Sequence, residues 1–331
     1  MTVIVGKEVG HTAFGLMGMT WRPKQTPDEQ AFAAMDKALE LGANLWFGAE
    51  FYGTPEPTLN LHLIRRYFQS RPQNADKVVL NLKGGIDTKI MRSNGSPEFV
   101  KSSVDNCNTI LDGAKKIDIF TCARVDPNTP IEQTIGALAE YVQEGKIGAI
   151  GLSEASADTI EKAVKVHPIA NVEAEFSLWS TEILENGVAA ACKRHNIPIT
   201  AYSPLGRGFL TGEIKSFSDI PEGDMRTHFD RFQPENFDIN LKLVSQVQQV
   251  AEKKGVTAAQ LALAWVKSQS GVNSMPTILP IPGATLDTRV IENCADVSIT
   301  PQEKAELDNI IASTQIKGLR YNAAMEKTLY I

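Results

Sequence analysis

The segment "IDIFTCARVDPNTPIEQTIGALAEYVQEGKIGAIGLSE", residues 117–154, decides the fold class. Its two short apolar runs, 117–122 and 147–153, are hydrophobic at nearly every position, which is typical of parallel strands buried on both faces. Between them, residues 129–145 have the spacing of an amphipathic helix and end at Gly145, where a helix is expected to stop. The segment therefore predicts two parallel strands joined by a helix.

The same alternation continues over almost the whole chain. Strand-like runs lie at 13–16, 43–47, 77–83, 117–122, 147–153, 170–176, 197–203 and 277–283. Helical patterns lie at 28–42, 58–70, 96–113, 129–145, 156–166, 183–196, 239–269 and 286–297. Eight strand-then-helix units without a linker predict a single (β/α)8 TIM barrel, with residues 1–331 forming one domain. We expect residues 2–10 to form an N-terminal hairpin or plug, and residues 301–331 to form an extra C-terminal helix and a tail.

A doubly wound α/β sheet is the alternative fold. That fold usually carries G-x-G-x-x-G after its first strand, whereas residues 15–21 read "GLMGMTW". The barrel is therefore favoured. Thr26 followed by Glu29 resembles a capping box at the start of the first helix, and Gly42 is placed to end that helix.

Composition narrows the possible functions. The formal charge of −6 and the pI near 5.5 argue against nucleic acid as a partner, because phosphate contacts need a basic face. No apolar run approaches the roughly 20 residues that a membrane-spanning helix needs, and the first residues lack a signal-peptide pattern. The four scattered cysteines show no C-x-x-C pair and no metal-ligand spacing, so neither a metal site nor a disulfide framework is expected. We expect a cytoplasmic protein.

Tyr52 and Lys83 follow the second and third predicted strands, and the active site of a TIM barrel lies at such strand ends. A phenol with a pKa of about 10 is a weak proton donor, and a nearby ammonium group stabilises its phenolate. The pair could therefore serve as a general acid. The alternative is a tyrosine packed at a turn beside a solvent-facing lysine.

The loops after the seventh and eighth strands suit a ligand that carries phosphate. Residues 202–212, "YSPLGRGFLTG", combine an aromatic ring with a serine and glycines whose backbone can approach a phosphate. Residues 280–293, "PIPGATLDTRVIEN", place a loop before a helix N-terminus, with Arg289 one turn into the helix. Taken singly, each could be an ordinary surface loop.

Together these segments resemble the aldo-keto reductase family over nearly the whole chain. They are "GANLWFGAEFYG" (42–53), Lys83, "IGLSE" (150–154), "AYSPLGRG" (201–208) and "IPGATLDTRVIEN" (281–293), in the order and spacing of the family. The segments "MGMTWRPKQT", "NADKV", "CARVD", "GLSEAS" and "GLRYN" are similar to the fungal pyridoxal reductase branch. The resemblance implies a TIM barrel that binds NADP(H) and reduces carbonyl groups.

Only half of the family's catalytic tetrad carries over. Tyr52 matches the proton donor and Lys83 matches the lysine that tunes it, but Phe47 stands at the aspartate position and Ala123 at the histidine position. Without the aspartate, burial would push Lys83 towards losing its proton. Another carboxylate, an ordered water or a bound phosphate could compensate, and Glu50 is one candidate. A second hypothesis is that the ring of Phe47 fills space left beside the small Ala123.

The resemblance also implies a set of residues that bind the cofactor. Tyr202 would stack on the nicotinamide, Ser153 would hold its carboxamide, and Arg289 would meet the 2′-phosphate and favour NADP over NAD. Glu154 and Glu173 stand where the family commonly has Asn and Gln; a carboxylate has no amide donor, so a carboxamide hydrogen bond would change. The other implied cofactor contacts are Met19, Ser203, Leu205, Gly283, Thr285, Glu292 and Asn293.

Trp21, Phe47 and Arg124 would border the substrate, with Arg320 and Tyr321 of the tail nearby. An aromatic wall with one cation suits a flat heteroaromatic aldehyde such as pyridoxal, although Trp21 and Arg124 could equally brace the rim. Three functions stay open: NADPH-dependent reduction of pyridoxal to pyridoxine with a tyrosine general acid, reduction of general aldehydes, or an NADP-binding redox-sensing subunit with weak turnover. The implied partner is a small aldehyde, and the sequence predicts no oligomeric state.

Overall fold

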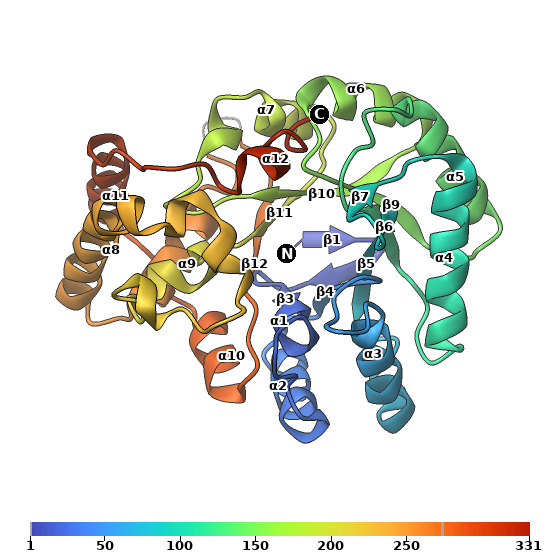
Figure 1. The fold of residues 1–331 in the computed structure, drawn as a ribbon, viewed down its shortest axis with the longest axis horizontal. Coiled ribbons are helices and arrows are strands. Elements are labelled where there is room, and N and C mark those ends of the chain that lie inside the picture. The colour runs from blue at the N-terminus through green and yellow to red at the C-terminus, as the bar shows by residue number, and fades with distance from the viewer. Residues whose placement is uncertain (1, 273–274) are drawn as a thin grey trace.

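A barrel of eight parallel strands forms the centre of the molecule, as the sequence predicts (Figure 1). The computed structural model describes residues 2–272 and 275–331. The strands pair in the order β3 (Phe14–Gly15), β4 (Leu45–Ala49), β5 (Val79–Gly84), β8 (Ile119–Cys122), β9 (Ala149–Ser153), β10 (Ile169–Glu175), β11 (Ile199–Tyr202) and β12 (Ile278–Ile281). Backbone hydrogen bonds from Ala13 to Pro280 and from Gly15 to Pro282 join the first strand to the last. These bonds close the sheet into a barrel.

Helices surround the barrel (Figure 1). They are α1 (Met17–Thr20), α2 (Asp28–Glu40), α3 (Leu59–Ser70), α4 (Pro97–Leu111), α5 (Ile131–Gln143), α6 (Ala157–Val166), α7 (Val188–Arg194), α8 (Pro234–Lys254), α9 (Ala258–Ser268) and α10 (Asp287–Cys294). The predicted helix at 239–269 is two helices, because Gly255 with a φ of 75° ends α8 and a capping box of Thr257 and Gln260 starts α9. Among the described residues, no helix combines the length and the apolar character needed to cross a membrane.

Two segments outside the repeat lie at the two ends of the barrel. The strands β1 (Thr2–Ile4) and β2 (Lys7–Val9) form an antiparallel hairpin, which confirms the prediction for residues 2–10. Ile4 and Val9 are buried against the first residues of the barrel strands, so the hairpin plugs the N-terminal end. The chain ends in α11 (Pro301–Ser313) and a tail that contains the short helix α12 (Ala323–Glu326), as expected for residues 301–331.

Local details depart from the predictions at two places. Thr26 does not cap α2: the N-cap is Pro27, and Oγ1 of Thr26 is buried without a hydrogen-bond partner among the described residues. Gly42 does follow the helix end, with a φ of 79°. The sequence also gave no sign of the hairpin β6 (Ile86–Asp87) and β7 (Arg92–Ser93), because two-residue strands are too short to show an alternating pattern.

The inside of the barrel changes from apolar to polar along the strands. Above the hydrophobic layer at the hairpin, side-chain hydrogen bonds link Thr121 to Asn81 at 2.9 Å, Asn81 to Asn171 at 3.0 Å and Asn171 to Thr200 at 2.8 Å. Gly151 on β9 makes this contact possible, because a Cβ there would lie 2.3 Å from Oγ1 of Thr121 and 2.8 Å from Oδ1 of Asn171. The next inward positions carry the charged residues of the mouth.

Candidate active site

Tyr52 lies at the C-terminal mouth of the barrel, on the turn after β4. The hydroxyl of Thr20 donates a hydrogen bond to the backbone oxygen of Tyr52 at 2.6 Å. Asn60 donates to Thr20 at 3.0 Å and accepts from the backbone N–H of Ala49 at 3.1 Å. The ring of Tyr52 stacks on Trp21, with the ring centroids 5.3 Å apart. The turn and the ring are therefore fixed by contacts from α1 and α3.

Lys83, near the end of β5, lies beside Tyr52. Its Nζ is 5.3 Å from the ring centroid of Tyr52 and 5.9 Å from that of Phe47. The same Nζ forms an ion pair of 2.6 Å with Oε2 of Glu173, which reaches across the barrel from β10. The side chains of Lys83 and Glu173 are only 9% and 1% exposed, so this ion pair is buried.

The charges of the site set the pKa values of Lys83 and Tyr52. Burial alone would lower the pKa of Lys83, but attraction to Glu173 and Tyr52 outweighs burial and leaves this pKa above its ordinary value. Burial raises the pKa of Tyr52; the charge of Lys83 lowers it, the charge of Glu173 raises it again, and the net pKa is raised. At neutral pH the site therefore holds a charged lysine beside a protonated phenol.

Glu50 does not supply the counter-charge of Lys83. Its carboxylate accepts hydrogen bonds from the hydroxyl of Ser103 and, at 2.7 Å, from the side-chain amide of Asn106. Both partners lie on α4, which packs on the outside of the barrel. The candidate named from the sequence is thus replaced by Glu173.

The ring of Phe47 does not fill the space beside Ala123. Phe47 packs in the apolar layer at the hairpin end, whereas Ala123 belongs to a separate cluster with Ala49, Phe51 and Tyr52. Phe47 and Ala49 are two residues apart on β4, so both point into the barrel, but Phe47 lies one layer below the mouth. Its ring therefore packs in a different cluster from Ala123. The aromatic residues nearest to Ala123 are therefore those of the turn after β4.

Replacing Phe47 with aspartate is expected to give no gain in reductase rate and to lower the free energy of unfolding by about 3–5 kcal/mol. Lys83 already pairs with Glu173, so the new carboxylate would be buried without a partner of its own, and the packing of the ring would be lost. Urea unfolding and steady-state kinetics measure the two effects. Phe47→Leu is the control for lost packing alone, and a large rise in kcat for Phe47→Asp would contradict the role of Glu173.

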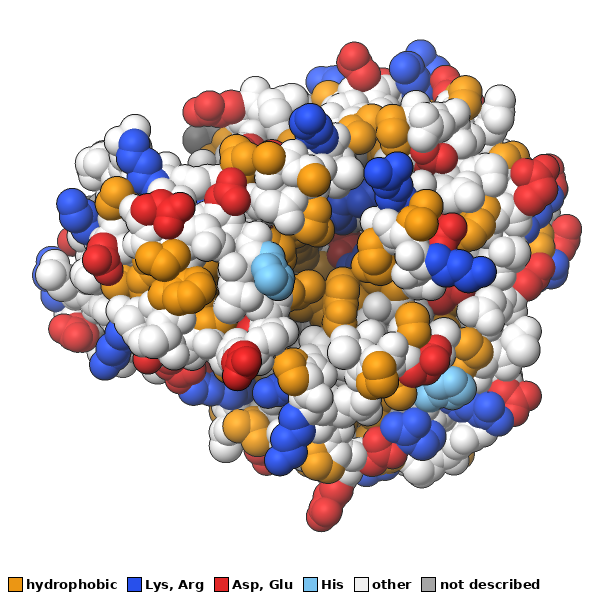
Figure 2. All heavy atoms as spheres, in the orientation of Figure 1, with side chains coloured by type: hydrophobic (Ala, Val, Ile, Leu, Met, Phe, Trp, Pro, Cys, Tyr) orange, Lys and Arg blue, Asp and Glu red, His pale blue; other side chains and the backbone are white. Residues whose placement is uncertain are grey.

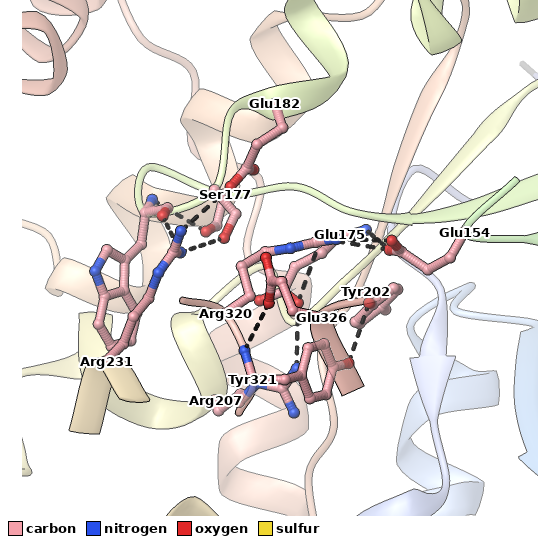
Figure 3. A network of polar contacts seen from close by, with 12 residues as sticks. Glu154, Glu175, Ser177, Glu182, Tyr202, Arg207, Arg231, Arg320, Tyr321 and Glu326 are labelled. Atoms are coloured by element: carbon pink, nitrogen blue, oxygen red, sulfur yellow. Dashed lines mark hydrogen bonds and ion pairs between the residues drawn. The ribbon is translucent and has the colours of Figure 1, made fainter. Parts of the chain in front are cut away.

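Polar groups from three further strands meet at the same mouth. Tyr202 ends β11, Ser153 ends β9, and Arg124 follows β8. Arg124 donates to the hydroxyl of Ser153 at 3.4 Å and to the hydroxyl of Tyr321 at 3.2 Å. The hydroxyls of Tyr321 and Tyr202 lie 3.2 Å apart and point toward each other (Figure 3). Tyr321 thus brings the C-terminal tail into contact with the strand ends.

Buried ion pairs hold the tail in this position (Figure 3). Arg320 lies 2.8 Å from Oε2 of Glu154 and 3.6 Å from Oε2 of Glu175. Arg207, in the loop after β11, pairs with Glu175 at 3.2 Å. Glu154 also accepts a hydrogen bond from the backbone N–H of Glu175 at 2.9 Å. Glu154 therefore binds the tail through Arg320 and the strand β10 through the backbone of Glu175.

A hydrophobic wall borders Tyr52 at the mouth. Trp21 and Ile86 pack against the cluster of Ala49, Phe51, Tyr52 and Ala123. Figure 2 shows the molecular face above the barrel hollowed at its centre, with hydrophobic side chains lining the hollow and basic side chains at its edge. This combination places apolar side chains beside the ring of Tyr52, with the ammonium group of Lys83 5.3 Å from the ring centroid.

The remaining predicted cofactor residues lie on the loops after β11 and β12 and on α10. Arg289 is exposed on α10, where it pairs with Glu292 at 2.7 Å and contacts Glu213 from the loop after β11. Met19 differs from the rest in burial, because its side chain is fully buried in the hydrophobic core. The other predicted residues of these loops are Ser203, Leu205, Gly283, Thr285 and Asn293.

The residues at the mouth fit the nicotinamide end of NADP(H). Oε1 of Glu173 is buried and has no hydrogen-bond partner among the described residues. A carboxamide offers N–H donors and a carbonyl acceptor, so Oε1 can accept one hydrogen bond while the hydroxyl of Ser153 donates another. Tyr202 presents an aromatic ring on the neighbouring strand end. Glu173 can therefore bind Lys83 and a carboxamide at once, one oxygen for each.

We did not predict the two buried sets of ion pairs at the mouth from the sequence. One joins Lys83 to Glu173, and the other joins Arg320 and Arg207 to Glu154 and Glu175. A signal was present: acids stand at positions 154, 173 and 175 on consecutive strand ends, and arginines at 124, 207 and 320. Charged side chains are seldom fully buried unless they are paired, so such a cluster predicts pairing. The alternation of strand residues places 171, 173 and 175 on one face, toward the interior.

Comparison with known proteins finds relatives along the whole chain. The model of the Aldo/keto reductase family matches residues 12–312. The chain is 43% identical over 337 residues to "Probable pyridoxal reductase 2" of Schizosaccharomyces pombe, covering 100% of both chains. It is 36% identical to an aldo-keto reductase of the same organism, yakc, whose name includes NADP(+), covering 93% and 90% of the two chains. The glycerol dehydrogenase AKR11B4 from Gluconobacter oxydans has a TM-score of 0.77 and 25% identity, covering 94% of both chains.

Proposed function

The chain belongs to the aldo/keto reductase family, a family of NADP-dependent oxidoreductases, and on this premise we propose that it reduces pyridoxal to pyridoxine with NADPH. The observation that carries the proposal is the protonated phenol of Tyr52 beside the charged Lys83, at the mouth of the barrel and against an aromatic wall. The relative named as a probable pyridoxal reductase, matched over its full length, supports the substrate. The relative whose name includes NADP(+) supports the cofactor.

The lining of the mouth supports a flat aromatic aldehyde. Trp21 stacks on Tyr52 and meets Phe51 edge to face, with centroids 5.9 Å apart, so an aromatic ring can pack beside them. Pyridoxal carries a phenolic oxygen next to its aldehyde. Arg124 and Tyr321 offer a cation and a hydroxyl for that oxygen, at hydrogen-bond distance from each other.

Different residues of the chain donate the proton, stabilise charge and orient the cofactor. When bound, NADPH supplies the hydride for the carbonyl carbon. Tyr52 donates its proton to the carbonyl oxygen, and the charge of Lys83 stabilises the phenolate that remains. Ser153 and Glu173 orient the carboxamide, and Tyr202 supports the ring face.

Steady-state oxidation of NADPH with pyridoxal and with a simple aliphatic aldehyde tests the proposal. We expect kcat/KM for pyridoxal to exceed that for butyraldehyde by about tenfold or more, because the aromatic wall and Arg124 contact only the former. A preference for butyraldehyde would favour a general aldehyde reductase. Tight NADPH binding without turnover of either aldehyde would overturn the proposal and favour an NADP-binding subunit.

Glu213→Gln is expected to tighten NADPH binding about two- to fivefold and to leave NADH binding unchanged. In the free chain Glu213 contacts the guanidinium of Arg289, so it competes with a 2′-phosphate for this cation. NADH lacks that phosphate and serves as the control ligand. Fluorescence titration gives both dissociation constants, and an equal change for the two cofactors would show that Arg289 does not read the 2′-phosphate.

A further inference from the structure

We propose that Glu173 on β10 is the positioning residue that keeps Lys83 charged during aldehyde reduction, since position 47 on β4 carries an uncharged phenylalanine. The inference rests on the proposed function and deepens it. Phe47 has no charge to offer, whereas Oε2 of Glu173 lies 2.6 Å from Nζ of Lys83. The ammonium group therefore receives its counter-charge from the opposite wall of the barrel.

The layer of side chains below the Lys83–Glu173 ion pair fixes the positions of the two strands that carry it. One layer below, Asn81 and Asn171 hydrogen-bond at 3.0 Å, and they stand on the same two strands two residues before Lys83 and Glu173. Side chains two residues apart on a strand point the same way. The Lys83–Glu173 ion pair therefore crosses the barrel in the same direction as the Asn81–Asn171 hydrogen bond, one layer nearer the mouth. Thr121 and Thr200 fix the two asparagines, so β10 presents Glu173 to Lys83 from a fully hydrogen-bonded layer.

Few titratable groups face Lys83 from the surrounding elements. Glu173 approaches from β10 and Tyr52 from the turn after β4, while Arg124, after β8, acts on Tyr52. Among the described residues, Glu173 is the carboxylate within ion-pair distance of Lys83. Without it, burial would govern the lysine, and burial favours the neutral amine. A neutral amine cannot stabilise the phenolate of Tyr52.

The ionisation of Lys83 is measured directly by NMR. In protein carrying ¹³C-labelled lysine, assigned with Lys83→Arg, the wild-type Cε signal is expected to titrate only above pH 10. In Glu173→Gln the midpoint is expected to fall by about three pH units. Glu50→Gln is the matched control, since it removes a nearby carboxylate that binds Ser103 and Asn106, and it should leave the midpoint in place. An unchanged midpoint in Glu173→Gln would overturn the proposal.

Moving the carboxylate from β10 to β4 provides a second test. Glu173→Gln is expected to lower kcat at pH 8 about tenfold or more and to shift the alkaline limb of the pH–rate profile to lower pH. In Phe47→Asp/Glu173→Gln, the new carboxylate stands on β4 at the position whose ring now lies 5.9 Å from Nζ of Lys83, and the limb is expected to return toward its wild-type position. A merely structural role for Glu173 predicts no such return.

The outcomes separate this inference from the proposed function. If wild-type protein reduces no aldehyde, the proposed function fails, while the NMR titration still reports whether Glu173 keeps Lys83 charged. If the wild type is active and Glu173→Gln has an unchanged lysine midpoint and pH profile, the inference alone fails. If Glu173→Gln does not fold, the lysine midpoint of the double variant decides: a charged Lys83 supports the inference, and a low midpoint overturns it.

Discussion

Tyr52→Phe is expected to lower kcat for aldehyde reduction about 10³-fold, because general acid catalysis commonly contributes 10²- to 10⁴-fold. The variant keeps the ring that stacks on Trp21 and loses only the hydroxyl that we propose as the proton donor. The backbone contact from Thr20 to residue 52 stays as well, so the fold should be retained. Steady-state kinetics with NADPH and pyridoxal give the loss, and fluorescence titration should show NADPH affinity within about twofold of the wild type.

Tyr141→Phe is the matched control for this substitution. The Tyr141 hydroxyl donates to Asp105 at 2.7 Å on the outside of the barrel, between α5 and α4. Its removal deletes a tyrosine hydroxyl far from the mouth and should leave kcat unchanged. If Tyr52→Phe retains more than about a tenth of the wild-type kcat, another group donates the proton and the assignment of Tyr52 is wrong.

Arg320→Met is expected to lower the free energy of unfolding by about 3–5 kcal/mol at pH 7, because it leaves Glu154 as a buried charge without its main partner. Arg320 and Glu154 are 1% and 0% exposed at their side chains, and their closest contact is 2.8 Å. Methionine keeps most of the length of arginine, so the charge is the chief loss. Arg194→Met is the control: Arg194 pairs with Glu161 at 2.6 Å but is 58% exposed, and its loss should cost less than about 1 kcal/mol.

The pH dependence of this destabilisation follows from the pKa of Glu154. Burial raises that pKa, but Arg320 and Arg124 outweigh burial and hold it below its ordinary value. A lowered carboxyl pKa stabilises the fold above the unfolded pKa of about 4.3, and the stabilisation is lost as the pH falls through the folded pKa. In Arg320→Met burial dominates and the pKa rises. The loss of unfolding free energy in Arg320→Met should be full at pH 7 to 8 and smaller at pH 5. Urea unfolding that shows a larger loss at pH 5 would contradict the role of Arg320 as the partner of a charged Glu154.

The fold could be predicted from the sequence because its signal is local and repeated. The apolar runs and helix patterns of the segment 117–154 recur along the chain, and all eight predicted strands are present. Two of the departures lie where the local sequence pattern is too short or fits one helix as well as two. The two-residue strands β6 and β7 are too short to show a period, and residues 239–269 keep helical periodicity across the turn at Gly255 that separates α8 from α9.

The candidate site was predictable only as far as it is built from local motifs. Tyr52 and Lys83 follow adjacent strands, so their proximity follows from strand order. Glu173 is 90 residues from Lys83 in sequence, and their contact depends on which inward positions face each other across a closed barrel. The tail is further still: Arg320 lies 166 residues from Glu154, in a segment without a repeating pattern. Such pairings depend on tertiary geometry, which propensity and periodicity do not encode.

Product analysis decides between aldehyde reduction by this barrel and binding of NADPH without turnover. Wild-type protein is incubated with NADPH and pyridoxal, and pyridoxine is quantified chromatographically against the loss of absorbance of NADPH. The expected result is one pyridoxine formed for each NADPH oxidised over many turnovers. Tight binding of NADPH with pyridoxal recovered unchanged and no alcohol formed would contradict the proposed reduction of pyridoxal.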